Sequence, residues 1–156
     1  MGFSWKGFDV SMQWTAAWNV SRSISSVFRQ PFTDRTNSDQ GGLLEYMLDH
    51  TWTPENPNPN AEYPRATFIN DTNNYAESTL WEKDAKYLRL KNLQIAYNFN
   101  FPFMKKLKLN TMQLALSGYN LLTFTPYFWS DPESKASNSP SYPLTKTYSL
   151  SLKLGF

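Results

Sequence analysis

The sequence predicts an all-β fold: antiparallel up-and-down strands, about four in number, forming the C-terminal portion of a transmembrane β-barrel. Three observations predict it. Long segments alternate between apolar and polar residues, short and long connections alternate along the chain, and the chain closes on an amphipathic strand that ends at Phe156. Because successive side chains of a strand point to opposite faces, each such segment has one apolar and one polar face.

The first long strand is expected over residues 8–20. Its even positions, from Phe8 to Val20, are all apolar, and five of its six odd positions are polar. This length exceeds the roughly 9–11 residues that a tilted strand needs to cross a bilayer. Trp5-Lys6-Gly7 before it predicts a tight turn, because glycine relaxes the backbone there.

Three further strands are expected, at about residues 87–99, 111–122 and 144–156. A short link joins the first two of these, and Pro102 in that link is placed to start one helical turn. In the closing strand, the even positions from Tyr148 to Phe156 are apolar, whereas Ser149, Ser151, Lys153 and Gly155 form the other face.

Two long connections, residues 21–86 and 123–143, are predicted to be loops on one side of the sheet. In the first, apolar residues from Leu43 to Leu48 have helical spacing behind a possible cap at Ser38 or Asp39. His50 would end this short helix as a surface or capping residue. Four prolines between Trp52 and Arg65 then predict a stiff, extended loop.

Composition excludes several classes of function. The net charge of +2 gives no electrostatic reason to expect nucleic acid as a partner. The absence of cysteine and the single histidine, His50, remove most metal and nucleophile–base constellations, so no metal, cofactor or catalytic residue is expected. No apolar run is long enough for a transmembrane helix. The first residues lack the pattern of a secretory signal, so an envelope protein would be represented here by a fragment.

The alternation alone also fits a soluble antiparallel β-sandwich, the commoner source of such a pattern. In that alternative the protein binds carbohydrate, with Trp52 and Trp129 as a stacking platform. The barrel is favoured because a sheet with one uniformly apolar face exposes too large a patch for a soluble monomer. Aromatic residues also gather at both ends of the strands, as in interfacial girdles: Trp5, Phe8, Tyr97, Phe99, Phe101 and Phe156 at one end, and Trp18, Phe124, Tyr127 and Phe128 at the other.

Several ordered motifs closely resemble the C-terminal end of the SusC/RagA family of TonB-dependent outer-membrane transporters. They are Trp5–Ser11, Trp52–Pro57, Tyr87–Leu93, Gly118–Thr125, Asp131-Pro132-Glu133 and Tyr142-Pro143-Leu144. The resemblance covers most of the chain, except for about residues 20–42 and 67–76. It implies that residues 1–156 are the C-terminal segment of a barrel of about 22 strands with a plugged lumen.

The resemblance further implies uptake of a nutrient, a glycan or a peptide, across the cell outer membrane. The expected partners are a SusD-like surface lipoprotein, outer-membrane lipid, and the TonB complex through an N-terminal region that these residues do not match. This chain would supply barrel wall and outer loops only and would not be an enzyme. Phe156 would be the sorting terminus of the closing strand.

Four loop residues are candidates for contact with ligand or partner. Trp52 and Trp129 could stack on sugar faces, although packing against neighbouring loops is the simpler interpretation. Asp131 and Glu133 could be an acid pair, but Pro132 between them indicates a turn, and catalysis would require a shaped cleft as well.

Overall fold

A computed structural model describes residues 1–32, 43–67, 72–134 and 144–156. The chain forms two compact units, and each is described on its own. The sheet unit comprises Met1–Trp18, Lys86–Pro126 and Pro143–Phe156. The loop unit comprises Asn19–Ala85 and Tyr127–Tyr142. The two long connections predicted from the sequence therefore fold together into one unit.

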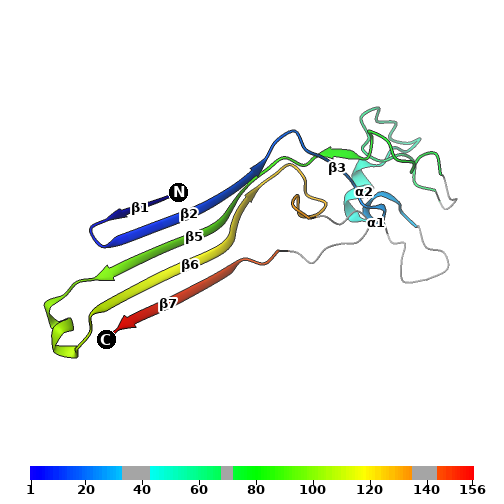
Figure 1. The fold of residues 1–156 in the computed structure, drawn as a ribbon. Helices are drawn as coiled ribbons and strands as arrows, with labels where there is room; N and C mark the ends of the chain where they lie inside the picture. Colours follow the sequence, from blue (N-terminus) through cyan, green and yellow to red (C-terminus); the bar gives the residue numbers. More distant parts are fainter. Residues whose placement is uncertain (33–42, 68–71, 135–143) are drawn as a thin grey trace. The chain divides into compact units, whose positions relative to one another are not determined.

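The sheet unit is a single five-stranded sheet in the order β1-β2-β5-β6-β7, with every neighbouring pair antiparallel (Figure 1). The strands lie beside one another in the order of the chain, as expected for up-and-down strands. Their bounds are β1 Gly2–Trp5, β2 Phe8–Ala17, β5 Tyr87–Phe99, β6 Thr111–Phe124 and β7 Thr147–Gly155.

Five strands replace the predicted four, because β1 pairs with β2 ahead of the turn. Four residues were too few for the alternation in β1 to be recognised. The bounds of β5 agree with the prediction, and β6 runs two residues further, to Phe124. The strand predicted to reach residue 20 ends at Ala17, two residues before the left-handed Asn19 (φ 56°). β7 begins at Thr147 rather than 144.

The turn predicted at Trp5-Lys6-Gly7 is confirmed as a two-residue hairpin loop. Trp5 pairs with Phe8, and Lys6 and Gly7 both have positive φ, 46° and 90°. Two consecutive left-handed residues are typical of a type I′ turn, whose twist matches that of the strands it joins. The short link between β5 and β6 contains the predicted helical turn as a 3-10 helix, η1 (Pro102–Leu107).

The register places the apolar side chains in rows that cross the whole sheet, because directly paired residues of antiparallel strands point to the same face. Two rows contain one residue from each of the five strands. One row is Phe3, Val10, Ile95, Leu116 and Leu150, and the other is Trp5, Phe8, Tyr97, Leu114 and Leu152. The intervening rows are polar or small, for example Ser11, Gln94, Ser117 and Ser149.

A bulge at Lys91 keeps the apolar face continuous. In β5, Leu88 and Leu90 have the opposite parity to Leu93 and Ile95, so an unbroken strand would turn them to different faces. The register shifts at this point against both neighbours. Gln13 pairs with Asn92 whereas Trp14 pairs with Leu90, so β5 has one residue more than β2 here. On the other side, Asn92 pairs with Tyr119 and Leu90 with Leu122, so the register passes over Asn120 and Leu121 of β6. One extra residue in β5 therefore restores Leu88 and Leu90 to the apolar face.

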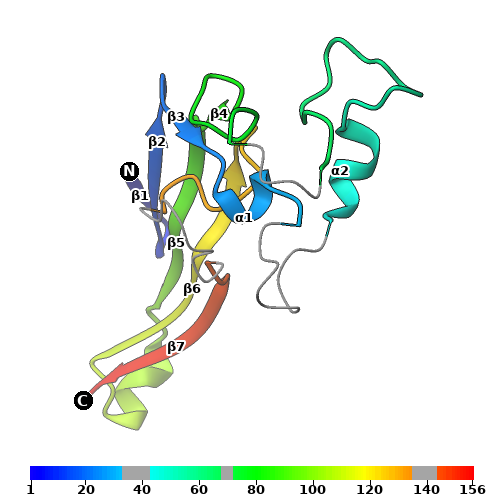
Figure 2. The same ribbon diagram turned by 90° about the vertical axis from the view of Figure 1, so that its right-hand side faces the viewer.

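The loop unit contains four short elements (Figure 2), and it has a hydrophobic core of its own. They are β3 Ser21–Ser23, α1 Ser26–Arg29, α2 Glu45–His50 and β4 Glu82–Asp84, with β3 and β4 paired. The buried residues are Ile24, Met47, Tyr63, Tyr75, Trp81, Ala85, Tyr127 and Trp129. They come from both long connections, so residues as far apart in the chain as Ile24 and Trp129 belong to one core.

The predicted short helix is confirmed as α2, but its start differs. The residue that precedes the helix is Leu44, with extended backbone and no side-chain cap. The proposed capping residues Ser38 and Asp39 lie outside the described residues. The proline-rich stretch that follows contains no helix or strand among residues 52–62, and Thr51 and Tyr63 close it with a parallel bridge.

Substitution of Gly7 tests the hairpin. A Cβ at this position would lie 3.0 Å from the Asn98 carbonyl oxygen and 3.2 Å from the Tyr97 ring, in addition to the cost of a positive φ. We expect Gly7→Ala to lower the free energy of unfolding by about 1–3 kcal/mol, measured by urea titration of the protein assembled in detergent. Lys6→Asn is the matched control, because asparagine tolerates left-handed backbone. Equal destabilisation by both changes would contradict this account.

Candidate functional site

Trp129 lies in an aromatic cluster at the core of the loop unit and is only 8% exposed. Its ring is 5.2 Å from that of Tyr46 and 5.9 Å from that of Tyr63, both edge-on, and 4.3 Å from Phe128. Edge-to-face pairs of this kind stabilise a core beyond the area they bury. The packing interpretation of Trp129 thus fits its burial better than an open sugar-stacking platform.

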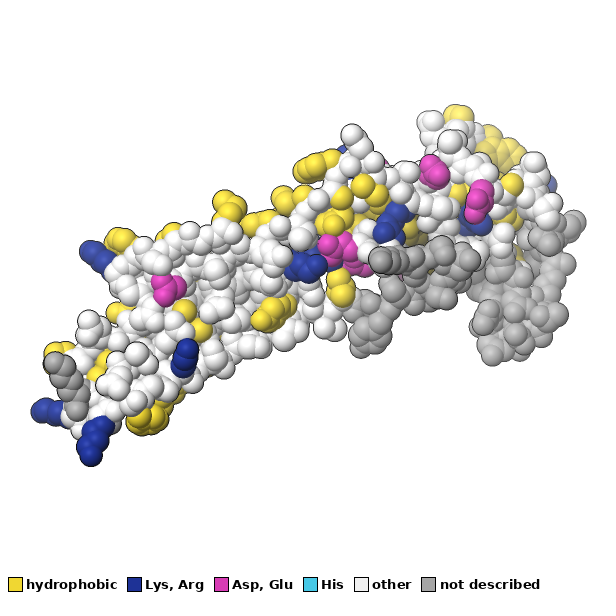
Figure 3. All heavy atoms as spheres, viewed as in Figure 1, with side chains coloured by type: hydrophobic (Ala, Val, Ile, Leu, Met, Phe, Trp, Pro, Cys, Tyr) yellow, Lys and Arg dark blue, Asp and Glu magenta, His cyan; other side chains and the backbone are white. Residues whose placement is uncertain are grey.

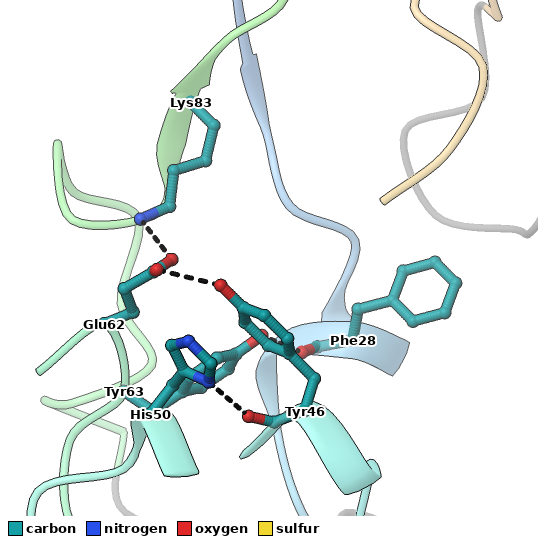
Figure 4. A network of polar contacts seen from close by, with 6 residues as sticks. All are labelled: Phe28, Tyr46, His50, Glu62, Tyr63 and Lys83. Carbon is teal, nitrogen blue, oxygen red and sulfur yellow. Dashed lines mark hydrogen bonds and ion pairs between the residues drawn. The ribbon is translucent and has the colours of Figure 1, made fainter. Parts of the chain in front are cut away.

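A polar network links three segments beside this cluster (Figure 4). The Tyr46 hydroxyl donates to Glu62 Oε1 at 2.9 Å, and Lys83 Nζ lies 3.4 Å from Glu62 Oε2. His50 Nδ1 donates to the Tyr46 carbonyl oxygen at 2.8 Å, and its ring stacks on that of Tyr46 with centroids 3.8 Å apart. His50 is half-buried, and its partner is a carbonyl of its own helix.

Half-buried Tyr46 and buried Tyr63 both have a raised pKa. Burial raises the pKa of Tyr46 to about 12, and the hydrogen bond to Glu62 and the charge of that carboxylate act in the same direction. The pKa of Tyr63 is also raised, first by burial and then by the charge of Glu62. Its hydroxyl donates to the Phe28 carbonyl oxygen at 3.1 Å. Both phenols are thus held protonated, as hydrogen-bond donors within the loop unit.

The structure gives hydrogen bonds at two of the other candidate loop residues, Trp52 and Asp131. Trp52 is half-buried, and its backbone N–H donates to the Tyr63 carbonyl oxygen at 2.9 Å. Asp131 Oδ1 accepts the backbone N–H of Glu133 at 2.8 Å, and the Asp131 carbonyl oxygen accepts that of Ser134 at 3.0 Å. This is turn geometry, as Pro132 indicated.

Trp81 is the largest fully buried side chain of the described chain, and sequence reasoning missed it. Its indole Nε1 donates to the Asn74 carbonyl oxygen at 3.1 Å, and the Arg29 guanidinium lies 5.9 Å from its ring. Neither its neighbours nor its spacing form a periodic pattern, so only the packing of the two long connections identifies it as core.

The polar face of the sheet carries a hydrogen-bond chain across four strands. Ser4 Oγ donates to Asp9 Oδ1, Asn98 Nδ2 donates to Asp9 Oδ2, each at 2.5 Å, and Gln113 Nε2 donates to Asn98 Oδ1 at 2.8 Å. The residues come from β1, β2, β5 and β6. A polar face cross-linked in this way suits contact with water or polar groups.

The apolar face is uncovered in the described chain. Three neighbours in one apolar row remain open to solvent: Ile95 is 39% exposed, Leu116 is 50% exposed and Leu150 is 72% exposed. Phe156 follows β7 and is 83% exposed. Apolar area of this extent in contact with water is unfavourable by roughly 25 cal/mol per Å², so the face requires an apolar environment.

Charge is divided sharply between the two units. The sheet unit contains nine of the fifteen Lys and Arg residues but one of the thirteen Asp and Glu residues, a formal net charge of +8. The loop unit contains the other six basic and twelve acidic residues, a formal net charge of −6. The small overall charge of +2 therefore conceals two oppositely charged parts.

A cavity of about 620 Å³ opens beside η1 in the sheet unit. Apolar side chains and amides line it, with one charged group: among them are Asn98, Phe99, Phe101, Met104, Gln113 and Lys153. In the part of the chain that the structure describes, no cluster of three or more His, Cys, Asp or Glu could hold a metal ion. The described helices are all too short or too polar to cross a membrane.

No protein-family profile matches the chain. Two curated proteins of Formosa agariphila resemble it: TonB-dependent receptor P3, 33% identical over 120 residues, and TonB-dependent receptor P26, 31% identical over 117 residues. These matches cover 69% and 67% of the chain but 11% and 12% of the relatives. The chain thus spans about a ninth of the length of these receptors.

Solved structures of RagAB resemble the fold over 99% of the chain and 16% of the solved chain. The RagAB peptide importer in the 'closed-closed' state has a TM-score of 0.71 at 25% identity. The structure of the RagAB peptide transporter has a TM-score of 0.73 at 23% identity.

Fold and sequence together define the chain as part of a TonB-dependent receptor. Within that class, it belongs to the SusC/RagA family. The predicted antiparallel barrel-type fold is confirmed, with the sheet left open in these residues. The likeness favours the barrel over the soluble β-sandwich.

The raised tyrosine pKa values predict how the loop unit responds to alkali. Because the pKa of Tyr46 and of Tyr63 is higher in the folded than in the unfolded chain, their contribution to stability is complete below about pH 10. It is lost as the pH rises toward 12. We expect near-ultraviolet circular dichroism of the loop aromatics to disappear over this range, together with the rise of tyrosinate absorbance.

Glu62→Gln is the matched variant, because it removes the carboxylate charge and keeps an acceptor for the Tyr46 hydroxyl. Without that charge the pKa of both tyrosines should be less raised, so the rise of tyrosinate absorbance should move to lower pH. A transition at the same pH in both proteins would contradict the role assigned to Glu62.

Two adjacent residues of α2 test whether the loop unit has a real core. Met47 is 1% exposed and Leu48 is 63% exposed. We expect Met47→Ala to destabilise the loop unit by about 2–5 kcal/mol, and Leu48→Ala to change it by less than about 0.5 kcal/mol. Limited proteolysis of the assembled protein measures this local opening. Equal protection of both variants would show that the core does not hold the loops together.

Proposed function

We propose that residues 1–156 are the C-terminal segment of the barrel of a TonB-dependent outer-membrane receptor that takes up a nutrient. The segment contributes wall strands and two outer loops and carries out no chemistry, in keeping with relatives named as receptors, importers and transporters. The observation that carries the proposal is the pair of apolar rows that cross all five strands on an uncovered face.

Strand length supports a membrane location. β2, β5, β6 and β7 contain 10, 13, 14 and 9 residues, against roughly 9–11 needed to cross the hydrocarbon core at a tilt. In lipid every backbone polar group must be paired, so a sheet crosses only as part of a closed barrel. The open edges of β1 and β7 would then be paired by the remaining strands of the receptor.

The loop unit would lie on the outer side, since barrels of this kind have short inner turns and long outer loops. Its formal charge of −6 and its own core fit a preformed surface for a partner. We propose a SusD-like surface lipoprotein as that partner. The TonB complex would act through a region other than these residues.

The transported nutrient would be a glycan or a peptide. Peptide import is the activity named for RagAB, which is 25% identical to this chain or less. Trp52, half-buried beside the Tyr63 backbone, is the best placed of the candidate contacts, because Trp129 is in the core. Asp131 and Glu133 would shape the second loop.

Uptake by the parent receptor tests the proposal. Cells that lack the gene should lose growth on one class of glycan or peptide, and the wild-type gene should restore it only when TonB is present. Labelled substrate accumulation measures this. Restoration without TonB would contradict the assignment, as would a chain that is soluble and monomeric and melts cooperatively without detergent.

Deletion of Phe156 tests the closing strand. The full-length receptor without this residue should reach the outer membrane in smaller amounts, because the apolar end of β7 would no longer be presented for assembly. The heat-modifiable folded band on gels measures assembled barrel. Leu144→Ala, at an exposed apolar position ahead of β7, is the control and should leave the band unchanged.

A further inference from the structure

The short-turn end of the sheet carries a group of exposed lysines. Lys6 lies in the β1–β2 turn, Lys106 lies in η1 and Lys108 follows η1. We call these three residues the turn lysines. All are exposed, and both Lys6 and Lys108 have left-handed backbone, with φ of 46° and 56°. Figure 3 shows Lys and Arg side chains gathered at this end of the sheet.

The turn lysines have no acidic counterpart within their unit. Asp9 is the single acidic residue of the sheet unit, and its two oxygens accept from Ser4 and Asn98 on the polar face. The ion pair recorded among the described residues joins Lys83 and Glu62 in the loop unit. The positive charge at the turns is thus available to an outside anion.

Aromatic rings place these lysines at the depth of a membrane interface. Phe8, Tyr97, Phe99 and Phe101 form a continuous chain at this end, with ring centroids 4.6, 4.8 and 5.7 Å apart. Lys6 Nζ lies 5.0 Å from the centroid of the Trp5 ring. Aromatic side chains settle at the boundary between hydrocarbon and headgroups, and a lysine beside them reaches the headgroup layer.

The middle parts of the strands are uncharged, whereas charged residues lie toward and beyond the strand ends. Between Val10 and Ala17, along Asn92–Phe99 and through all of β6, there is no charged residue. The charged residues inside the strands of this sheet, Asp9, Arg89, Lys91 and Lys153, lie within five residues of a strand end. Further cations lie beyond the strand ends, at Lys86, Lys146 and the turn lysines. An uncharged middle with cations at both ends is the arrangement expected of a sheet that spans a bilayer.

We propose that the turn lysines bind the phosphate groups of anionic phospholipids in the inner leaflet of the outer membrane. This rests on the proposed location of the sheet in that membrane. Each lysine near an anionic surface contributes roughly a fivefold gain in affinity at low salt, so three give on the order of a hundredfold preference for anionic over zwitterionic lipid. The contact would hold the short-turn end at a fixed depth.

Lys153 supplies a matched control. It lies at the same end of the sheet and is equally exposed, but it pairs with Gln113 on the polar face, which would face the lumen. Its replacement changes the net charge of this end without altering the lipid-facing turns. The test variant is Lys6→Asn, Lys106→Gln and Lys108→Asn, in which asparagine suits the two left-handed positions.

The experiment titrates the full-length receptor in non-ionic detergent with phosphatidylglycerol or phosphatidylcholine and counts bound lipids by native mass spectrometry. Wild type and Lys153→Gln should prefer phosphatidylglycerol on the order of a hundredfold at low salt, and high salt should weaken the preference. The triple variant should bind both lipids within a few-fold of each other. The folded band on gels confirms that each variant is assembled.

Equal binding of the two lipids by the assembled wild type would overturn the proposal while leaving nutrient uptake untouched. A preference unchanged in the triple variant would also overturn it. If the triple variant keeps its lipid preference but loses substrate accumulation in cells, the turn lysines face an acidic protein instead. Failure of every variant and of wild type to assemble in detergent would count against the membrane location itself.

Discussion

Pairing of the backbone across the sheet is the constraint on which the rest of this structure depends. Five antiparallel strands pair their backbones in one sheet, and their register aligns long apolar side chains in rows on one face. A face this exposed is stable in hydrocarbon and not in water. The proposed membrane location rests on that register, and the same register brings Ser4, Asp9, Asn98 and Gln113 into one hydrogen-bond chain on the polar face.

The loop unit follows a different rule. It is built from two long connections that are held together by aromatic packing around Trp81 and Trp129, rather than by strand pairing. Protonated tyrosines, which donate to Glu62 and to the Phe28 carbonyl, keep the polar edge of this core satisfied. Its formal charge of −6 and its own core are compatible with the outer location and the SusD-like partner that we propose.

The two units carry opposite net charges. The formal charge is +8 on the sheet unit and −6 on the loop unit. Within each unit this excess is unfavourable, because like charges repel. The division fits the proposed location, in which the sheet unit contacts lipid headgroups and the loop unit contacts water and a partner. The overall charge of +2 did not indicate this separation, because it is the sum of the two opposite charges.

The sequence by itself determined four of the five strands of the sheet, the turn at Gly7, the helical turn at Pro102 and the family, because these depend on local periodicity and on short motifs. It could not reveal the bulge at Lys91, which is defined only by the partners of β5, or the burial of Trp81, which depends on two distant connections meeting. Trp129 likewise changed from a candidate stacking surface to a core residue. Tertiary structure decided these points because burial and register are properties of paired segments and not of either segment alone.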